Sequence, residues 1–443
     1  MSPEPDRAPP LLPRATQPDT PRPLAGIRVV DLTVAVAGPI STQLLASLGA
    51  DVIRIETPWG RPRTPATVAP STTDAATLGD GADAPWNRMP LYNELNHSKR
   101  SLILNLLDPR GRDVLLDLVE CSDVLVENFA PRVMGNFDLE WDVLRERNPG
   151  LVFVSMPAFG KEGPLRDRVS YGPGIDAMSG LSWLSGYADE GPLKPGNFYC
   201  DQNAGLHTAL AVVSALRARE RTGRGQTVEL AMIEGELQLV ADALLDVQFS
   251  GREPARMGNA HHCWAPHGVY PAAGDDAWIA IVCRDDQDWA SLCAELALDG
   301  VDVAADDPRF RTALRRWKHR DALDDLLRGW TSRHEPQALA ERLQAGGVPA
   351  SNVQGARDLL LDPQFLAREA AVTVPHAGVG PSPVPQPAFR LSRTPTPPAK
   401  AAPLFAEDND YVFHTLLGYD RERVRGLIDA GVTSYALMER PPR

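Results

Sequence analysis

LAGIRVVDLTVAVAGPISTQLLASLGADVIRIE, residues 24–56, is the stretch that decides the fold. Residues 27–32 form a short run rich in β-branched side chains, which is typical of a strand. Ala-Gly-Pro at residues 37–39 interrupts that run, residues 41–48 follow as a helical segment, and residues 51–55 form a second strand-like run. Because two parallel strands need a crossover between them, this order predicts a βαβ unit.

The same alternation continues along the chain, with strand-like runs at residues 101–106, 123–127 and 151–155 separated by helical segments. This pattern predicts an α/β protein with a doubly wound parallel sheet. Ligands of such sheets bind outside the carboxyl ends of the strands, which places the site near residues 35–39. The loop contains neither G-x-G-x-x-G nor G-x-x-x-x-G-K-[ST], so the sequence does not predict a dinucleotide or P-loop nucleotide site.

Composition narrows the function classes. The formal net charge of -13 argues against general nucleic-acid binding, which requires a basic face. The five cysteines are scattered without C-x-x-C spacing, which favours a reducing, cytoplasmic compartment. No apolar run reaches the roughly 18 residues of a membrane span, and the Pro-rich residues 1–23 are expected to be a disordered tail without a signal core.

A series of short motifs follows in a characteristic order. It begins with AGP (37–39), LGADVIRIE (48–56) and NHSKRSLILNL (96–106), and continues with DVLVENFAPRVM (123–134), FGKEGP (159–164), DQNAGLHTALAVVSALRARERTGRGQ (201–226) and RMGN (256–259). In order and spacing this series resembles the family III CoA-transferases, over roughly residues 24–365.

The resemblance implies a Rossmann-like large domain with a smaller α+β domain, in two chains threaded through each other as an interlocked-ring dimer. It implies a CoA-binding α/β domain at residues 24–221, a linker helix and small domain at 222–346, and a return to the large domain at 347–443. The expected assembly is a homodimer, with a heterodimer of paralogues as the alternative.

The resemblance also implies positions for CoA, which would be substrate and product rather than a resident cofactor. The adenine and phosphate side would meet Lys99, Arg100, Asn128 and Phe129, and the loop Ala35-Val36-Ala37 would line the reacting thioester. Charged Lys and Arg side chains suit a diphosphate, and an aromatic ring suits adenine or pantetheine. A solvated turn at Lys99-Arg100 and a core position for Phe129 are the structural alternatives.

Family members of the transferase type carry a nucleophilic aspartate in a motif that here reads SYGPGIDAMSGL, residues 170–181. The usual carboxylate position falls at Gly172 or Pro173, so the nearest carboxylate, Asp176, is the expected nucleophile. Asp176 would share a helix face with position 172, or would merely complement a helix N-terminus. Asp201 is the second candidate, although an Asp just before the helix expected at residues 204–216 is more often its N-cap.

The leading hypothesis is therefore an enzyme that moves CoA between an acyl-CoA thioester and a free carboxylic acid. One alternative is an acyl-CoA racemase or isomerase, although FGKEGP offers Lys161 and Glu162 and no His for an acid–base pair. The other alternative is a non-catalytic subunit of a heteromeric CoA-transferase. His261, His262 and Cys263, with His267, match no closed zinc spacing, and consecutive histidines are expected to point apart, so no metal site is predicted.

Overall fold

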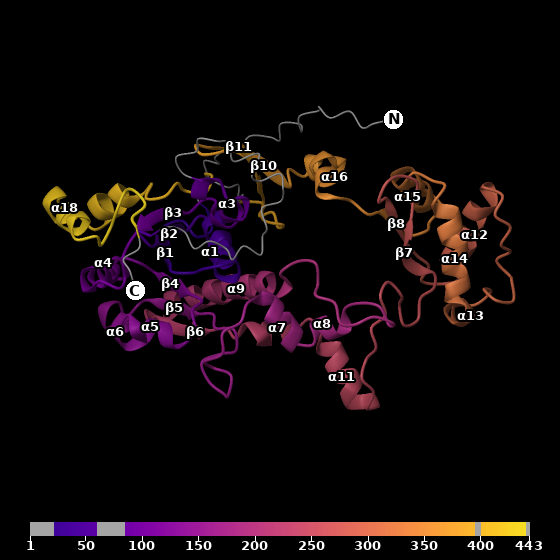
Figure 1. The fold of residues 1–443 in the computed structure, drawn as a ribbon, viewed down its shortest axis with the longest axis horizontal. Coiled ribbons are helices and arrows are strands. Elements are labelled where there is room, and N and C mark those ends of the chain that lie inside the picture. Colours follow the sequence, from indigo (N-terminus) through magenta and orange to yellow (C-terminus); the bar gives the residue numbers. More distant parts are fainter. Residues whose placement is uncertain (1–21, 60–84, 395–399, 440–443) are drawn as a thin grey trace. The chain divides into compact units, whose positions relative to one another are not determined.

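A computed structural model describes residues 22–59, 85–394 and 400–439. The chain forms two compact units (Figure 1). The first unit holds the described residues up to Leu181, then Lys194–Ser250 and those from Pro363 onward; the second holds Ser182–Leu193 and Gly251–Asp362. The disordered tail expected at residues 1–23 lies almost entirely outside the described residues.

The first unit is built on a six-stranded sheet in the order β3-β2-β1-β4-β5-β6, and all neighbouring strands are parallel. The strand order reverses between β1 and β4, so the connections leave these two strands toward opposite edges. That reversal opens a crevice at the carboxyl ends of β1 and β4. The strands are β1 Arg28–Asp31, β2 Asp51–Glu56, β3 Arg100–Ile103, β4 Val124–Glu127, β5 Val152–Ser155 and β6 Gln226–Glu229.

Alternate residues of the strands face two separate cores, as expected for a sheet covered on both faces. Val30 belongs to a core with residues of α4, α6 and α18, whereas its neighbour Val29 belongs to a core with residues of α1, α7 and α9. The helices concerned are α1 Ala37–Ser47, α4 Pro109–Glu120, α6 Trp141–Arg147, α7 Gly172–Met178, α9 Tyr199–Thr222 and α18 Arg421–Asp429. The structure therefore confirms the doubly wound α/β sheet.

One strand differs from the sequence expectation. Residues 228–247 are rich in Ala, Leu and Glu, a composition that favours a helix, yet the chain forms the edge strand β6, then α10 Met232–Leu237 and α11 Ala241–Ser250. β6 is four residues long and largely exposed, so it lacks the apolar run that marks the buried strands. Pairing with β5, a long-range contact, decides its conformation.

The second unit packs helices against a three-stranded antiparallel sheet, β7-β8-β9. β7 His267–Pro271 and β8 Trp278–Val282 pair as an antiparallel hairpin. The division differs from the expected boundary at residue 347, because β9 Ala350–Asn352 pairs with β8 and keeps the chain in this unit as far as Asp362. Its helices are α12 Asp286–Leu298, α13 Ala313–Lys318, α14 Arg320–Thr331, α15 Pro336–Ala345 and α16 Ala356–Leu361.

The Pro-rich segment near the C-terminus contains a hairpin of β10 Ala371–His376 and β11 Gly380–Pro385. Proline is tolerated in such a strand because an edge leaves every second N–H unused. The chain then forms the π-helix η2 Tyr411–Leu416 before α18. Shorter elements are η1 Pro85–Arg88, α3 Pro90–Asn96, α5 Arg132–Asn136, α8 Leu181–Leu184 and α17 Pro363–Ala367. Among the described residues, no helix is both long and apolar enough to cross a membrane.

Candidate active site

The loops after β1 and β4 meet at the crevice and are tied together by one side chain. Asn128 accepts a hydrogen bond from the backbone N–H of Val34 at 2.8 Å and donates one to the Val34 carbonyl at 2.9 Å. This amide mimics a strand partner and fixes the course of the β1–α1 loop. Ala35, the next residue, has a left-handed backbone (φ 59°), which turns the chain into α1.

A buried ion pair between Lys99 and Asp31 also stabilises this loop. The Lys99 ammonium donates to Asp31 Oδ2 (3.0 Å), to the Pro39 carbonyl (3.0 Å) and to Asn96 Oδ1 (2.9 Å), and the side chain has no exposed surface. All three N–H donors are therefore used inside the protein, at the end of β1 and the start of α1. Burial lowers the pKa of Lys99 to about 8. The predicted contact of Lys99 with CoA stays a prediction, and it would require this ammonium to leave its three internal partners.

Arg100 is also engaged within the protein. Its guanidinium pairs with Asp51 at 2.6 Å and Asp408 at 2.8 Å, and it stacks on the Tyr411 ring with 3.8 Å between the guanidinium carbon and the ring centroid. These contacts fasten the C-terminal segment to β2 and β3. The predicted role of Arg100 in CoA binding stays a prediction, and it would require this guanidinium to exchange partners.

A cavity of about 200 Å³ lies at the crevice and brings three of the predicted residues together: Ala35, Asn128 and Phe129. Val36 and Ala37 belong to the same loop but are buried, with 7% and 1% of their surface exposed, and do not line it. The volume suits the thioester end of a ligand, since a whole drug-sized ligand needs about 300–1,000 Å³. The other lining residues are Val34, Ala130, Pro131, Met156, Ala158, Arg168, Val169, Ser170, Tyr171, Gly172, Asp201 and Met232.

Asp201 is the carboxyl group at this cavity. The structure corrects the expected N-cap role, because α9 begins at Tyr199 and Asp201 lies inside its first turn. Its carboxylate instead receives a hydrogen bond from the backbone of Ala37, at the N-terminus of α1. Burial, partly offset by that bond, raises the pKa of Asp201 to about 6.

Asp176 lies elsewhere. It is the fifth residue of α7, has no exposed surface, and is not among the described residues that line the cavity. One oxygen accepts a hydrogen bond from the Cys200 N–H at 3.2 Å, and Oδ2 has no hydrogen-bond partner in the described chain. Burial raises the pKa of its carboxyl group. The predicted nucleophilic role of Asp176 therefore stays a prediction, and the geometry does not favour it.

Asp176, Cys200 and Glu236 place their carboxylate and thiol groups within 4.8 Å of one another, all without exposed surface. Burial raises the pKa of each, that of Glu236 to about 7. Metal binding requires deprotonated ligands, whereas these shifts favour the protonated forms. Burial thus disfavours the charged form of each of these three groups.

Sequence reasoning missed Arg168. The side chain is exposed, lines the cavity, and forms no ion pair within the described part of the chain. A free guanidinium is a suitable partner for a carboxylate. No motif pointed to it, because the loop of residues 156–171 has no regular pattern; only its placement beside Phe129 and Asp201 identifies it.

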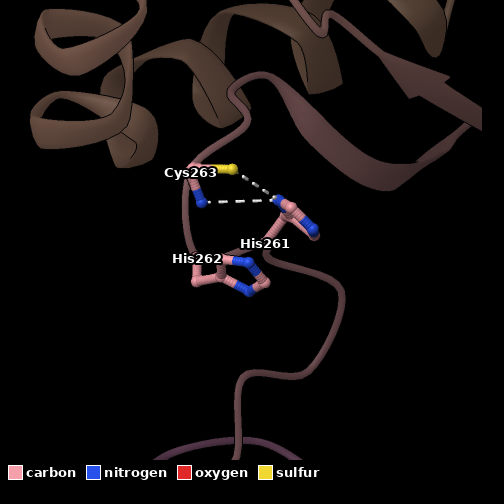
Figure 2. A group of neighbouring side chains, drawn as sticks. All are labelled: His261, His262 and Cys263. Carbon is pink, nitrogen blue, oxygen red and sulfur yellow. Dashed lines mark hydrogen bonds between the residues drawn. The ribbon is translucent and has the colours of Figure 1, made fainter. Parts of the chain in front are cut away.

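The second unit contains a separate cavity of about 900 Å³, with three arginines and three histidines in its lining. His261 and His262 line this cavity, and Cys263 follows them in the same turn (Figure 2). The two imidazoles stack with centroids 4.1 Å apart, so the expectation that they point apart is wrong. The Nδ1 atom of His261 accepts hydrogen bonds from the backbone N–H groups of Cys263 (3.4 Å) and Trp264 (3.2 Å), which fix the orientation of the ring.

Comparison with known proteins agrees with this architecture. The family model described as "CoA-transferase family III" matches residues 24–409. The chain is 32% identical to the succinyl-CoA–D-citramalate CoA-transferase of Chloroflexus aurantiacus, over 90% of this chain and 95% of that protein. It is also 32% identical to the formyl-CoA:oxalate CoA-transferase of Streptomyces coelicolor, over 93% of this chain and 100% of that protein.

Among solved structures, a CAIB/BAIF family protein from Brucella suis superposes with a TM-score of 0.78 at 30% identity, covering 89% of this chain and 99% of that one. The match therefore extends over both units rather than over a shared α/β sheet alone. The chain belongs to CoA-transferase family III.

Proposed function

We propose that this protein moves CoA from an acyl-CoA thioester to a free carboxylic acid, in the cavity at the carboxyl ends of β1 and β4. One observation carries the proposal: Ala35, Asn128 and Phe129, expected from the sequence to meet CoA, line one cavity with a carboxyl group. The loop and the aromatic ring would hold the pantetheine end, and the carboxylate would receive the acyl group.

The reaction requires a carboxylate on the enzyme, and no net proton is taken up or released. A carboxylate oxygen attacks the thioester carbonyl, the C–S bond breaks, and CoA leaves as the thiolate with a mixed anhydride on the enzyme. The thiolate then attacks the enzyme's own carbonyl carbon, which releases the first acid and leaves an enzyme-bound CoA thioester. The acceptor carboxylate then attacks this thioester and displaces CoA as the thiolate. The thiolate attacks the acceptor's carbonyl carbon in the new anhydride, which forms the product thioester and releases the enzyme carboxylate. Because water would hydrolyse both intermediates, a narrow cavity serves this chemistry.

The relatives are named for small carboxylic acids, among them D-citramalate, oxalate and glutarate. Arg168 offers a positive charge at the mouth of the same cavity. We infer that the acceptor is a small acid with a second anionic or strongly polar group, which Arg168 would bind by charge-assisted hydrogen bonds.

The test is a panel assay in which the purified protein receives each of succinyl-, glutaryl-, formyl- and oxalyl-CoA with each of a set of small dicarboxylic acids. Liquid chromatography with mass spectrometry should detect a new acyl-CoA for at least one pair. Phe129→Ala should weaken CoA binding about tenfold in titration calorimetry, since it removes an aromatic contact. Phe389→Ala, at an exposed ring in the same unit, is the matched control. Thioester hydrolysis without transfer would contradict the proposal.

Glycine at position 172, where the family carries its nucleophilic aspartate, favours one alternative function. In that alternative the chain is a non-catalytic subunit, and a paralogous partner carries the nucleophile. That alternative expects no transfer from the purified chain and full transfer when the partner is added. Transfer by the chain alone would exclude it.

A further inference from the structure

We propose that Asp201 is the nucleophile of this chain. Its carboxylate occupies the space that a side chain at position 172 would take if that residue were not glycine. The inference rests on the proposed function and names the residue that the function requires. Among the described residues, Asp201 is the only carboxyl group that lines the cavity with Ala35, Asn128 and Phe129.

The contact between positions 172 and 201 supports the assignment. A Cβ atom at position 172 would lie 2.0 Å from Oδ2 of Asp201, a separation at which one of the two groups must move. The Asp201 carboxylate thus stands where a side chain at position 172 would begin. The Asp201 side chain can adopt this orientation only because residue 172 is a glycine. The result is one carboxylate at the cavity.

The surroundings of Asp201 suit an attacking group. It is 7% exposed, which leaves an oxygen accessible from the cavity while most of the side chain is fixed. It lies in the first turn of α9 and bonds the backbone at the N-terminus of α1, and both helix ends favour the carboxylate form. With its pKa raised to about 6, the group is ionised at neutral pH and more basic than an exposed aspartate.

Asp176 has the opposite surroundings. One of its oxygens accepts a hydrogen bond from the Cys200 N–H, its carboxyl group lies within 4.8 Å of the Cys200 and Glu236 side-chain groups, and it does not line the cavity. For Asp176 to attack a thioester, α7 and α9 would have to separate, although they pack closely (Figure 1). Asp176 is therefore assigned to the buried cluster with Glu236, and Asp201 to the bond-forming step.

In this assignment Asp201 Oδ2 attacks the thioester carbonyl carbon and displaces CoA as the thiolate. The thiolate returns to the Asp201 carbonyl carbon, the anhydride C–O bond breaks, and the first acid leaves as its carboxylate. Asp201 then carries CoA as a thioester until the acceptor carboxylate attacks. No oxidant, reductant or additional proton takes part.

The deciding experiment traps the covalent intermediate in the full-length wild type. The protein is incubated with an acyl-CoA that supports transfer in the panel assay and is then treated with hydroxylamine, which converts an aspartyl thioester or anhydride into a hydroxamate. Peptide mass spectrometry should locate the hydroxamate on Asp201. A hydroxamate on Asp176 or any other residue would overturn the assignment while leaving the proposed function intact.

Two variants supply an independent readout. Asp201→Asn should lower kcat at least about 10³-fold, since an amide cannot attack, while CoA still binds in calorimetry. Asp176→Asn should keep transfer within about threefold and still give the hydroxamate on Asp201. Transfer at wild-type rate by Asp201→Asn overturns the assignment. A wild type that binds no CoA and transfers none instead refutes the proposed function, and the assignment with it.

Discussion

At the scale of single residues, the site depends on which side chains share one small space. Gly172 is buried and precedes Asp201 by almost thirty positions, yet the two are in contact across the N-termini of α7 and α9. A substitution at 172 therefore acts on the carboxylate of another residue. The sequence does not predict this contact; it indicates only that position 172 lacks the nucleophilic aspartate of the family.

Gly172→Ala should lower kcat at least about tenfold with little change in CoA affinity, because the added methyl group would displace the Asp201 carboxylate from its position. Gly174→Ala is the control from the same turn, since its Cβ would meet only the Oγ end of the Ser170 side chain. Steady-state kinetics and CoA calorimetry measure both. Equal rates for wild type and Gly172→Ala would refute the argument.

At the scale of the elements, the turn between β1 and α1 is held in place by close packing and by buried hydrogen bonds. Gly38 is needed there because a Cβ at this position would lie 2.4 Å from the Cβ of Thr33. Asp31 at the end of β1 has no exposed surface and binds Lys99, Thr33 and Thr42. Lys99 therefore supports this turn, and its predicted contact with CoA stays a prediction.

Lys99→Ala should lower the free energy of unfolding by about 3 kcal/mol, because it breaks a buried ion pair and leaves the Asp31 carboxylate with only the longer contact to Arg54, at 3.7 Å. The exposed pair of Arg145 and Asp142 in α6 provides the control, since Arg145→Ala should cost about 1 kcal/mol or less. Urea unfolding followed by circular dichroism gives both values. A Lys99→Ala protein as stable as Arg145→Ala, but with weaker CoA binding, would restore the expectation from sequence.

At the scale of the whole molecule, two features bear on stability and assembly. The first is the buried acidic cluster, in which neither oxygen of Glu236 has a hydrogen-bond partner among the described residues. The second is exposed apolar surface on each of two helices: Leu206 and Leu210 on α9, and Leu244, Leu245 and Phe249 on α11. Exposed apolar side chains in such numbers are typical of a protein–protein interface.

The cluster predicts a stability that falls with rising pH. Burial, with the nearby carboxylates of Asp176 and Asp201, raises the pKa of Glu236 from 4.5 to about 7. Between these values the folded state holds a proton that the unfolded state has lost, so stability decreases as pH rises through this window. Glu236→Gln should therefore stabilise the protein by about 1–3 kcal/mol at pH 8 and by much less at pH 5.

Thermal unfolding at the two pH values checks this, with the exposed Glu234→Gln on the same helix as the control. Equal effects of Glu236→Gln at pH 5 and pH 8 would show that the carboxyl group does not retain its proton in the folded state.

The apolar surface supports the expectation of a dimer, which stays a prediction. Sedimentation at micromolar concentration should show two chains, and Leu210→Glu together with Leu244→Glu should shift the protein toward monomer, because each buries a charge in an apolar interface. The paired control is Leu314→Glu, at an exposed leucine of the second unit. A wild type that remains monomeric at these concentrations would contradict the interlocked assembly.

Local pattern was enough for much of the fold. The stretch of residues 24–56 determined β1, α1 and β2 within a few residues, because β-branched runs, an Ala-Gly-Pro break and helix periodicity are signals carried by neighbouring residues. The same holds for β4, for β5 and for the hairpin of β7 and β8. The ordered motifs also determined the family, which the comparisons confirm.

Only the tertiary structure decided which charged groups face the cavity. The sequence presents Lys99, Asp176 and Asp201 as three comparable polar residues, but burial and partners separate them: Lys99 and Asp176 point inward, and Asp201 lines the cavity. The short strand β6 and the place of Arg168 were likewise decided by contacts with residues far along the chain. The direction of a side chain depends on the packing of distant elements, and no local pattern records it.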